Sequence, residues 1–209
     1  MVKVPRAWPG ETVCVIATGP SLTAEDVDYC RGKARVIAIN DAIRLAPWAD
    51  ALYATDAKWW TWHHGVPEFT GPKWSLEHSQ WNNTRAKYTD IQRLRNTGAG
   101  ALEHDPTGLR NGRNSGFAAI NLAVHYGAGR IVLLGYDMQP KFGKSHFFGE
   151  HPNKQKSPYP QFRAAMETLV KPLAKLRIEI VNCSRNSVLS CFPKAELRDV
   201  LKARDEVAA

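Results

Sequence analysis

Short apolar runs alternate with helical patterns along most of this chain, and this alternation limits the folds open to it more than any other feature. The runs lie at residues 12–17, 35–39, 51–54, 130–134 and 178–181. Helical patterns lie between them at about 23–32, 115–126 and 161–176. Strands that alternate with helices form a parallel sheet covered on both faces. We therefore predict an α/β fold: a single Rossmann-like domain, with a mostly parallel sheet and helices on both faces.

Two irregular segments interrupt this pattern. Six of the seven tryptophans lie between residues 48 and 81, and a long irregular stretch follows Asp137. Core packing is the commoner role of a tryptophan, and a wall on which sugars or bases stack is the alternative. We expect residues 1–209 to form one nucleotide-binding domain, with a tryptophan-rich insertion at about 57–90 and a loop or lid at about 138–160.

The charge of the chain suits an anionic partner. There are 28 Lys and Arg against 20 Asp and Glu, which gives a formal net charge of +8. Such an excess fits a nucleotide, a nucleic acid or an acidic substrate, although a solvated basic surface gives the same sum. No apolar run reaches the roughly 18–20 residues of a membrane span, and the first residues lack the apolar core of a signal peptide. We therefore expect a soluble, cytoplasmic protein.

Glycine and small polar residues follow each predicted strand. The carboxyl ends of parallel strands meet at one edge of a sheet, and ligands of such folds bind there. The residues at these ends are Thr18, Gly19, Pro20, Ser21, Asn40, Asp41, Thr55, Asp56, Gly135, Asp137 and Asn182. Turn chemistry alone also favours such residues. The turn at Gly19 matches neither GxGxxG nor the Walker sequence, which argues against dinucleotide oxidoreductases and P-loop kinases.

The sequence Arg113-Asn114-Ser115-Gly116 opens the strongest helical pattern. Free backbone N–H groups at a helix N-terminus, with a hydroxyl and nearby arginines, favour phosphate binding. The alternative is that Asn114 or Ser115 simply caps the helix. The neighbouring Arg110 and Arg113 favour the phosphate interpretation modestly.

Two histidines, His146 and His151, lie in the irregular stretch after Asp137. A loop histidine on the ligand side of a sheet is a candidate general acid or base. Metal ligation and simple surface exposure are the alternatives. Since no third metal ligand is evident in the sequence, we predict no metal site.

Several short motifs occur in an order typical of one enzyme family. They are Ile16-Ala17-Thr18-Gly19-Pro20-Ser21-Leu22, Asn40, Asn114-Ser115-Gly116, Ala123-Val124-His125-Tyr126-Gly127 with the strand up to Asp137, Ser145-His146-Phe147-Phe148-Gly149-Glu150-His151, and Asn186-Ser187-Val188-Leu189. Over roughly residues 12 to 192 the chain resembles the small bacterial CMP-sialic-acid-dependent sialyltransferases. More loosely, it resembles the motility-accessory-factor glycosyltransferases and the archaeal hydroxymethylpterin diphosphokinases.

The resemblance implies a role for each matching position. The turn 19–21 would shape the nucleotide phosphate site, and Asn40 would contact the nucleotide. Residues 114–116 would hold the phosphate or ribose. His151 would be the general base that deprotonates the acceptor hydroxyl, with His146 as the alternative. The remaining matches, which would lie near the base or ribose, are Asn182, Asn186 and Ser187.

We therefore predict a glycosyltransferase that uses a nucleotide-activated sugar as donor, is assisted by a histidine, and needs no metal or other cofactor. The acceptor is left open, and an anionic glycan or a modified nucleic acid would fit the charge. One alternative is a diphosphokinase-like enzyme on the same fold, with magnesium bound by Asp41, Asp56 or Asp137. Another is a non-catalytic protein that binds nucleotides or nucleic acid through its charge and its tryptophans.

Overall fold

The computed structural model describes residues 2–78, 81, 86–141, 143–149 and 157–202. Its centre is an eight-stranded sheet in the order β6-β5-β4-β3-β2-β1-β7-β8, in which neighbouring strands pair in parallel. The strands are β1 (Thr12–Ile16), β2 (Arg35–Ile39), β3 (Ala51–Tyr53), β4 (Lys73–Leu76), β5 (Ile91–Asn96), β6 (Gly108–Leu109), β7 (Arg130–Leu134) and β8 (Glu179–Asn182). The helices are α1 (Ala24–Tyr29), the 3-10 helix η1 (Asn40–Arg44), α2 (Ala57–Trp62), α3 (Ser115–Tyr126), α4 (Tyr159–Glu167), α5 (Val170–Lys175) and α6 (Leu197–Lys202).

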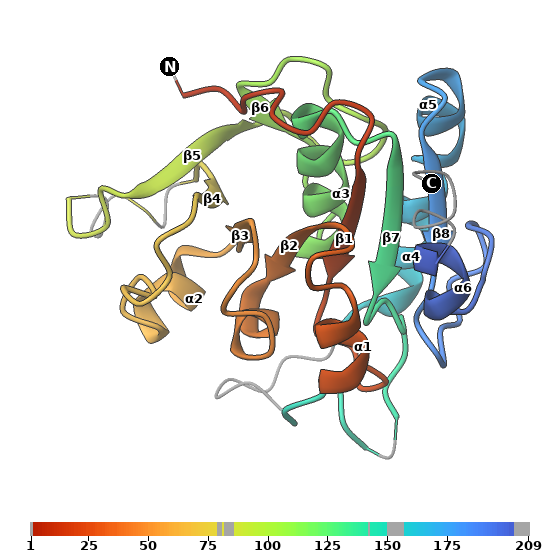
Figure 1. Ribbon diagram of the computed structural model, residues 1–209. Coiled ribbons are helices and arrows are strands. Elements are labelled where there is room, and N and C mark those ends of the chain that lie inside the picture. The colour runs from red at the N-terminus through yellow and green to blue at the C-terminus, as the bar shows by residue number, and fades with distance from the viewer. Residues whose placement is uncertain (1, 79–80, 82–85, 142, 150–156, 203–209) are drawn as a thin grey trace.

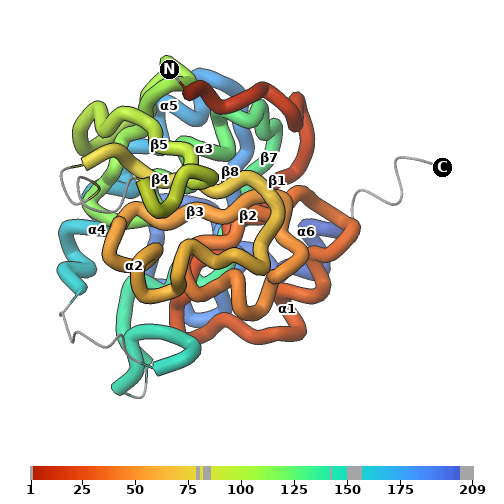
Figure 2. The backbone as a smooth tube through the Cα atoms, turned by 90° about the vertical axis from the view of Figure 1, so that its left-hand side faces the viewer, coloured from red at the N-terminus to blue at the C-terminus, as the bar shows by residue number. Residues whose placement is uncertain are grey.

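Alternate side chains of the central strands enter two separate cores. On one face, Val13 and Val15 of β1 join a core that includes residues of α3, α4 and α5. On the other face, Cys14 and Ile16 join a core that includes residues of α1, η1, α2 and α6. Figure 2 shows α3 and α5 on one side of the strands and α1 and α2 on the other. The predicted parallel α/β fold with helices on both faces is therefore confirmed.

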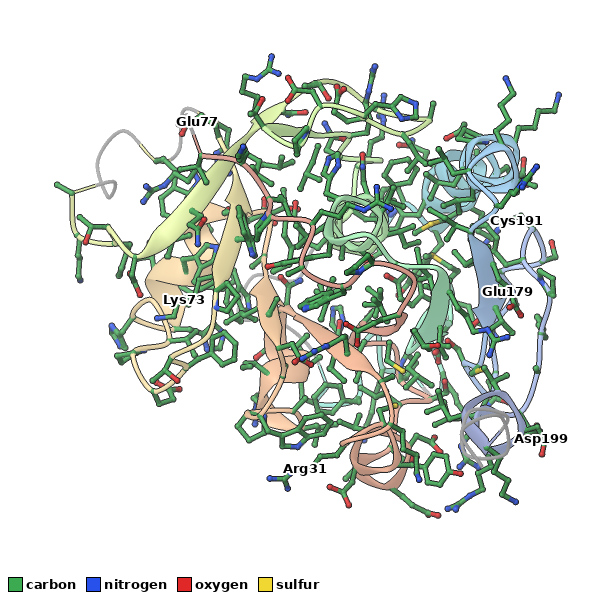
Figure 3. The ribbon with its side chains drawn as sticks, turned by 45° about the horizontal axis from the view of Figure 1, so that its top comes forward. Arg31, Lys73, Glu77, Glu179, Cys191 and Asp199 are labelled. Carbon is green, nitrogen blue, oxygen red and sulfur yellow. The ribbon has the colours of Figure 1, made fainter. Side chains whose placement is uncertain are left out.

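The order of the strands places a topological switch between β1 and β7. The chain runs outward from β1 through β2 to β6, and α3 then leads back to β7 on the other side of β1. Ile16 pairs with Leu134, so the two strands end level, and in Figure 1 their arrowheads point to the same end of the molecule. Lys73 of β4 and Glu179 of β8 lie on opposite sides of these central strands (Figure 3). Doubly wound sheets bind ligands at such a switch.

The apolar pattern does not predict the strands β4, β5 and β6. In β5 the buried positions are Ile91 and Leu94 among polar residues, and β6 is only two residues long. The strand β4 falls within the segment 57–90, which we expected to be an insertion. That segment contributes α2 and this strand, which lies between β3 and β5 in the sheet.

The helix predicted at about 161–176 is in fact two helices. The chain forms α4 and α5, with Thr168 and Leu169 between them. Pro172 has no N–H to donate. In a continuous helix its ring would also clash with the carbonyl group four residues earlier, at Thr168. This explains why one continuous helix does not form.

Within the described ranges, no helix has the length and apolar character needed to cross a membrane. The four cysteines are free, and Cys14, Cys30 and Cys183 are buried on the α1 face of the sheet. A hydrogen bond with Cys30, together with burial, raises the pKa of Cys14. The three thiols are therefore core residues, and that of Cys14 is protonated.

Candidate functional site

A cavity of about 510 Å³ opens at the carboxyl ends of the central strands. It lies where β1 and β7 end, and the first residues of α3 form part of its wall. Most residues predicted for the site line it, namely Thr18, Gly19, Pro20, Asn40, Asp56, Arg113, Asn114, Ser115, Gly116, Asp137 and His146. The cavity thus coincides with the switch point at which this fold class binds ligands.

Four other predicted residues that the structure describes do not line the cavity, namely Ser21, Asn182, Asn186 and Ser187. The Asn182 amide donates to Ser187 Oγ (2.9 Å), and Ser187 Oγ donates to the carbonyl of Tyr136 (2.6 Å). The carbonyl of Asn186 accepts a hydrogen bond from Gln139 (2.7 Å). These groups hold the segment after β8 against the end of β7, so they support the cavity wall from behind.

Asp137 ties the end of β7 to the turn after β1. Its carboxylate accepts hydrogen bonds from the backbone N–H (2.8 Å) and the hydroxyl (2.7 Å) of Ser21. The side chain is buried, and burial raises its pKa despite the two bonds from Ser21 and the charge of Lys141, which act in the other direction. Gly19 packs beside it, since a Cβ at that position would lie 2.5 Å from Asp137 Oδ1. The two turns therefore form one closely packed wall.

Removal of the Asp137 carboxylate is expected to destabilise the fold. Asp137→Ala leaves the N–H and hydroxyl of Ser21 without their acceptor, which costs about 2–4 kcal/mol of unfolding free energy. Asp137→Asn should cost much less, because its amide oxygen accepts from the N–H while its amide nitrogen donates to the hydroxyl oxygen. Urea denaturation of the three proteins measures the difference. Equal losses in both variants would contradict this role.

The same carboxyl group gives stability a pH dependence of definite sign. Because folding raises the pKa of Asp137, the unfolded chain ionises first once the pH passes about 4. The unfolded state then binds fewer protons than the native state, so the unfolding free energy falls until the raised pKa is passed. Asp137→Asn lacks this fall. The unfolding free energies of both proteins, measured between pH 4 and pH 8, isolate this fall. A wild-type stability that rises relative to that of Asp137→Asn over this range would refute the assignment.

Asn114 is the N-cap of α3. Its Oδ1 accepts from the N–H of Phe117 (2.9 Å), and its Nδ2 donates to the carbonyl of Gly112 (3.0 Å). The capping alternative therefore describes this side chain. The Ser115 hydroxyl lies 3.1 Å from the hydroxyl of Thr55 and accepts the Thr55 N–H (3.3 Å). These bonds fix the start of the helix against the end of β3.

The first turn of α3 presents backbone N–H groups at the cavity. Gly116 allows close packing, because a Cβ there would lie 2.9 Å from a ring carbon of Tyr136, whose hydroxyl donates to the Gly116 carbonyl (2.9 Å). Within the described part of the chain, the N–H groups of Ser115 and Gly116 have no hydrogen-bond partner. Arg113 lines the cavity beside them and bonds to Gln161 (3.2 Å). This part of the wall suits an anion.

His146 is held in the cavity wall by Thr18. Its Nδ1 lies 2.9 Å from Thr18 Oγ1, and the N–H of Phe147 donates to the Thr18 carbonyl (3.0 Å). The imidazole also stacks on Phe148, with ring centroids 5.1 Å apart. Thr18 thus fixes both the backbone and the ring of this segment. His151, which the sequence favours as the base, lies outside the described residues, so that preference stays a prediction.

Aromatic side chains reach the cavity from both faces of the sheet. Trp59 and Trp62 come from α2, and Tyr159 and Phe162 come from α4. Trp59 is buried and its indole N–H donates to Asp41 (2.8 Å), whereas Trp62 is 37% exposed. Trp59 is therefore a core residue, as is common for tryptophan, and Trp62 forms part of the cavity wall. The stacking of a sugar or base on these side chains stays a prediction.

The three carboxylates considered for magnesium are differently placed. Asp56 and Asp137 line the cavity, but Asp41 does not. Asp41 is buried against Trp59 and lies 3.5 Å from His63 Nε2. In the ranges that the structure describes, no three His, Cys, Asp or Glu side chains are arranged to hold a metal ion.

Sequence reasoning missed several cavity residues. Lys58, Tyr159 and Phe162 line the cavity. Lys58 could have been found, because it follows the predicted site residue Asp56 by two positions. The two residues of α4 carry no such signal, since only the tertiary fold brings that helix to the site.

In the comparisons with known proteins, no family model, no curated protein and no solved structure matches this chain. Its function must therefore be inferred from the cavity itself.

Proposed function

We propose that this protein is a glycosyltransferase that uses a nucleotide-activated sugar, with His146 as general base and no required metal. One observation carries the proposal: the imidazole of His146 is held 2.9 Å from Thr18 Oγ1 in a cavity at the switch between β1 and β7. Histidine is the side chain that changes charge near neutral pH. An imidazole fixed in this way can accept the proton of an acceptor hydroxyl that binds within hydrogen-bond reach of it.

Another part of the wall suits the departing nucleotide. The N–H groups of Ser115 and Gly116 face the same cavity, and Arg113 beside them contributes positive charge. Oriented N–H groups and fixed cations stabilise the negative charge that develops on a leaving phosphate. Asn40, in the left-handed region with φ 50°, lines the cavity as a further polar contact.

The reaction follows from these placements. His146 takes the proton of the acceptor hydroxyl while the acceptor oxygen forms a bond to the anomeric carbon of the sugar. The bond from that carbon to the phosphate oxygen breaks, and its electron pair leaves with the nucleotide. Thr18 keeps the imidazole in place through this exchange.

The diphosphokinase alternative receives less support. Its magnesium ion would use carboxylates that already have partners, since Asp137 binds Ser21 and Asp41 binds Trp59. Asp56 would be left as an exposed ligand at the cavity.

Calorimetric titration with cytidine, uridine, guanosine and adenosine phosphates, in EDTA and again in magnesium, tests the proposal. Metal-independent binding of one nucleotide, followed by its release from the matching sugar nucleotide, is the expected result. Binding of ATP only with magnesium would favour the diphosphokinase. Failure of every nucleotide to bind would overturn the enzyme in favour of a non-catalytic protein.

A further inference from the structure

The cavity wall includes aromatic side chains that have no role in the proposed transfer step. Trp62 is 37% exposed at its edge. Tyr159 and Phe162 line it as an edge-to-face pair with centroids 6.2 Å apart. The other large apolar side chains exposed in the described residues are aliphatic and do not line the cavity, namely Val2, Val170, Leu176 and Val188. An exposed tryptophan at a cavity offers a flat surface on which a planar ring can stack.

Basic side chains lie in and around the same cavity. Lys58 and Arg113 line it directly. Arg163 donates a hydrogen bond (3.3 Å) to the carbonyl of Met138, which is a lining residue. The charge of Lys141 opposes the rise in the pKa of Asp137, a lining residue, so this lysine also lies near the cavity.

A further cation lies behind the histidine. The guanidinium of Arg44 sits 5.6 Å from the ring centroid of Phe148, which stacks on His146. Positive charge is therefore present on both the α2 side and the histidine side of the cavity.

Neighbouring carboxylates cancel little of this charge at the surface. Asp137 is 1% exposed and accepts from Ser21. Asp41 is 4% exposed, accepts from Trp59 and lies 3.8 Å from Arg44, so it partly offsets that one cation. Asp56 is the exposed carboxylate among the lining residues that the structure describes. The accessible charge around the cavity is thus positive, in keeping with the net charge of +8.

From this stacking surface and this charge we infer that the acceptor is a single-stranded nucleic acid. One base stacks on Trp62, and the adjacent phosphates lie along Lys58 and Arg163. Aromatic side chains combined with a basic groove bind single strands without sequence preference. A paired base in a duplex cannot reach such a surface without leaving the stack. The role of this nucleic acid as acceptor rests on the proposed function, whereas its binding is inferred from the contacts described above.

Fluorescence anisotropy tests the inference with labelled single-stranded DNA and RNA of about 12 nucleotides. Trp62→Ala is expected to weaken binding by about tenfold or more, because it removes the stacking surface. Lys58→Ala is expected to reduce the slope of log K against log salt by about 0.7, the value for one lost phosphate contact on a single strand. Both expected effects together support a base-and-phosphate site.

Matched controls lie at the other end of the strands. Leu176 is an exposed apolar residue and Lys175 an exposed lysine, both just before β8 begins. Leu176→Ala and Lys175→Ala should leave both affinity and salt slope unchanged. An affinity that does not respond to Trp62→Ala would overturn the inference. So would equal binding of a duplex, or heparin binding that competes with the oligonucleotide at equal affinity, since these outcomes indicate a general polyanion surface.

The oligonucleotide is titrated without any sugar nucleotide, so the two proposals can fail separately. Binding that depends on Trp62, in a protein that binds no nucleotide and transfers no sugar, would overturn only the proposed function. Release of nucleotide from a sugar nucleotide, in a protein that binds no oligonucleotide, would overturn only the present inference.

Discussion

Replacement of His146 by alanine is expected to lower glycosyl transfer by about 10²–10⁴-fold, the range typical for loss of a general base. Nucleotide affinity should be unchanged, because the nucleotide phosphates are assigned to the start of α3 and to Arg113. The variant removes the proton acceptor and leaves the Thr18 hydroxyl at the cavity surface, where water can hydrogen-bond to it. Initial rates of nucleotide release, measured with calorimetric titration of the same preparation, separate turnover from binding.

The matched control for this experiment is His104→Ala. His104 is exposed and precedes β6, so it lies at the end of the strands away from the cavity. Its loss should change neither turnover nor binding. His151→Ala belongs in the same series, because the sequence favours that residue. Full turnover in His146→Ala, with loss of turnover in His151→Ala, would transfer the role of base to His151.

Gly19→Ala is expected to destabilise the protein by about 3 kcal/mol or more, at the upper end of the cost of overpacking. The added Cβ would lie 2.4 Å from the Gly135 carbonyl oxygen and 2.5 Å from Asp137 Oδ1. Hydrogen bonds keep both oxygen atoms from moving away from the added methyl group. The Gly135 oxygen accepts the Gly19 N–H (2.9 Å), and Ser21 holds Asp137 by two hydrogen bonds.

Gly32→Ala is the control that separates crowding from backbone strain. Gly32 has φ +74°, but a Cβ there would meet nothing within 4 Å. An alanine in this left-handed conformation costs about 1 kcal/mol. Thermal unfolding should therefore show a loss of about 6–12 °C for Gly19→Ala and about 2–4 °C for Gly32→Ala. Equal losses would mean that the turns relax around the new methyl group.

The parts of the fold that follow from local chemistry were predictable. After their first residues, the strands β1, β2 and β7 are buried on both faces, so each contains a continuous apolar run. The helix α3 spans the predicted 115–126, and Gly127, with φ 98°, ends it. The edge at which the cavity lies was also predictable, because the carboxyl ends of parallel strands must meet.

What depends on tertiary contacts was not predictable. The strand β5 lies near the edge of the sheet, and few of its residues are buried. It therefore tolerates the polar residues Gln92, Arg93 and Arg95, which leave no apolar pattern by which the strand could be predicted. Asn114 suits both a cap and a phosphate ligand in sequence, and only its bonds to Phe117 and Gly112 show that it caps the helix. The cavity residues of α4 are positioned by a helix whose placement no local pattern specifies.

The central position of β1 also has a consequence for how the chain folds as it is synthesised. Cys14 pairs with Val36 on one side and with Val132 on the other, so the two neighbours of this strand emerge from the ribosome at very different times. Until β7 appears, β1 is an apolar strand with one open edge, the type of surface through which nascent chains associate. The cavity needs the end of β7, so the nascent chain forms it only after this slow, long-range pairing.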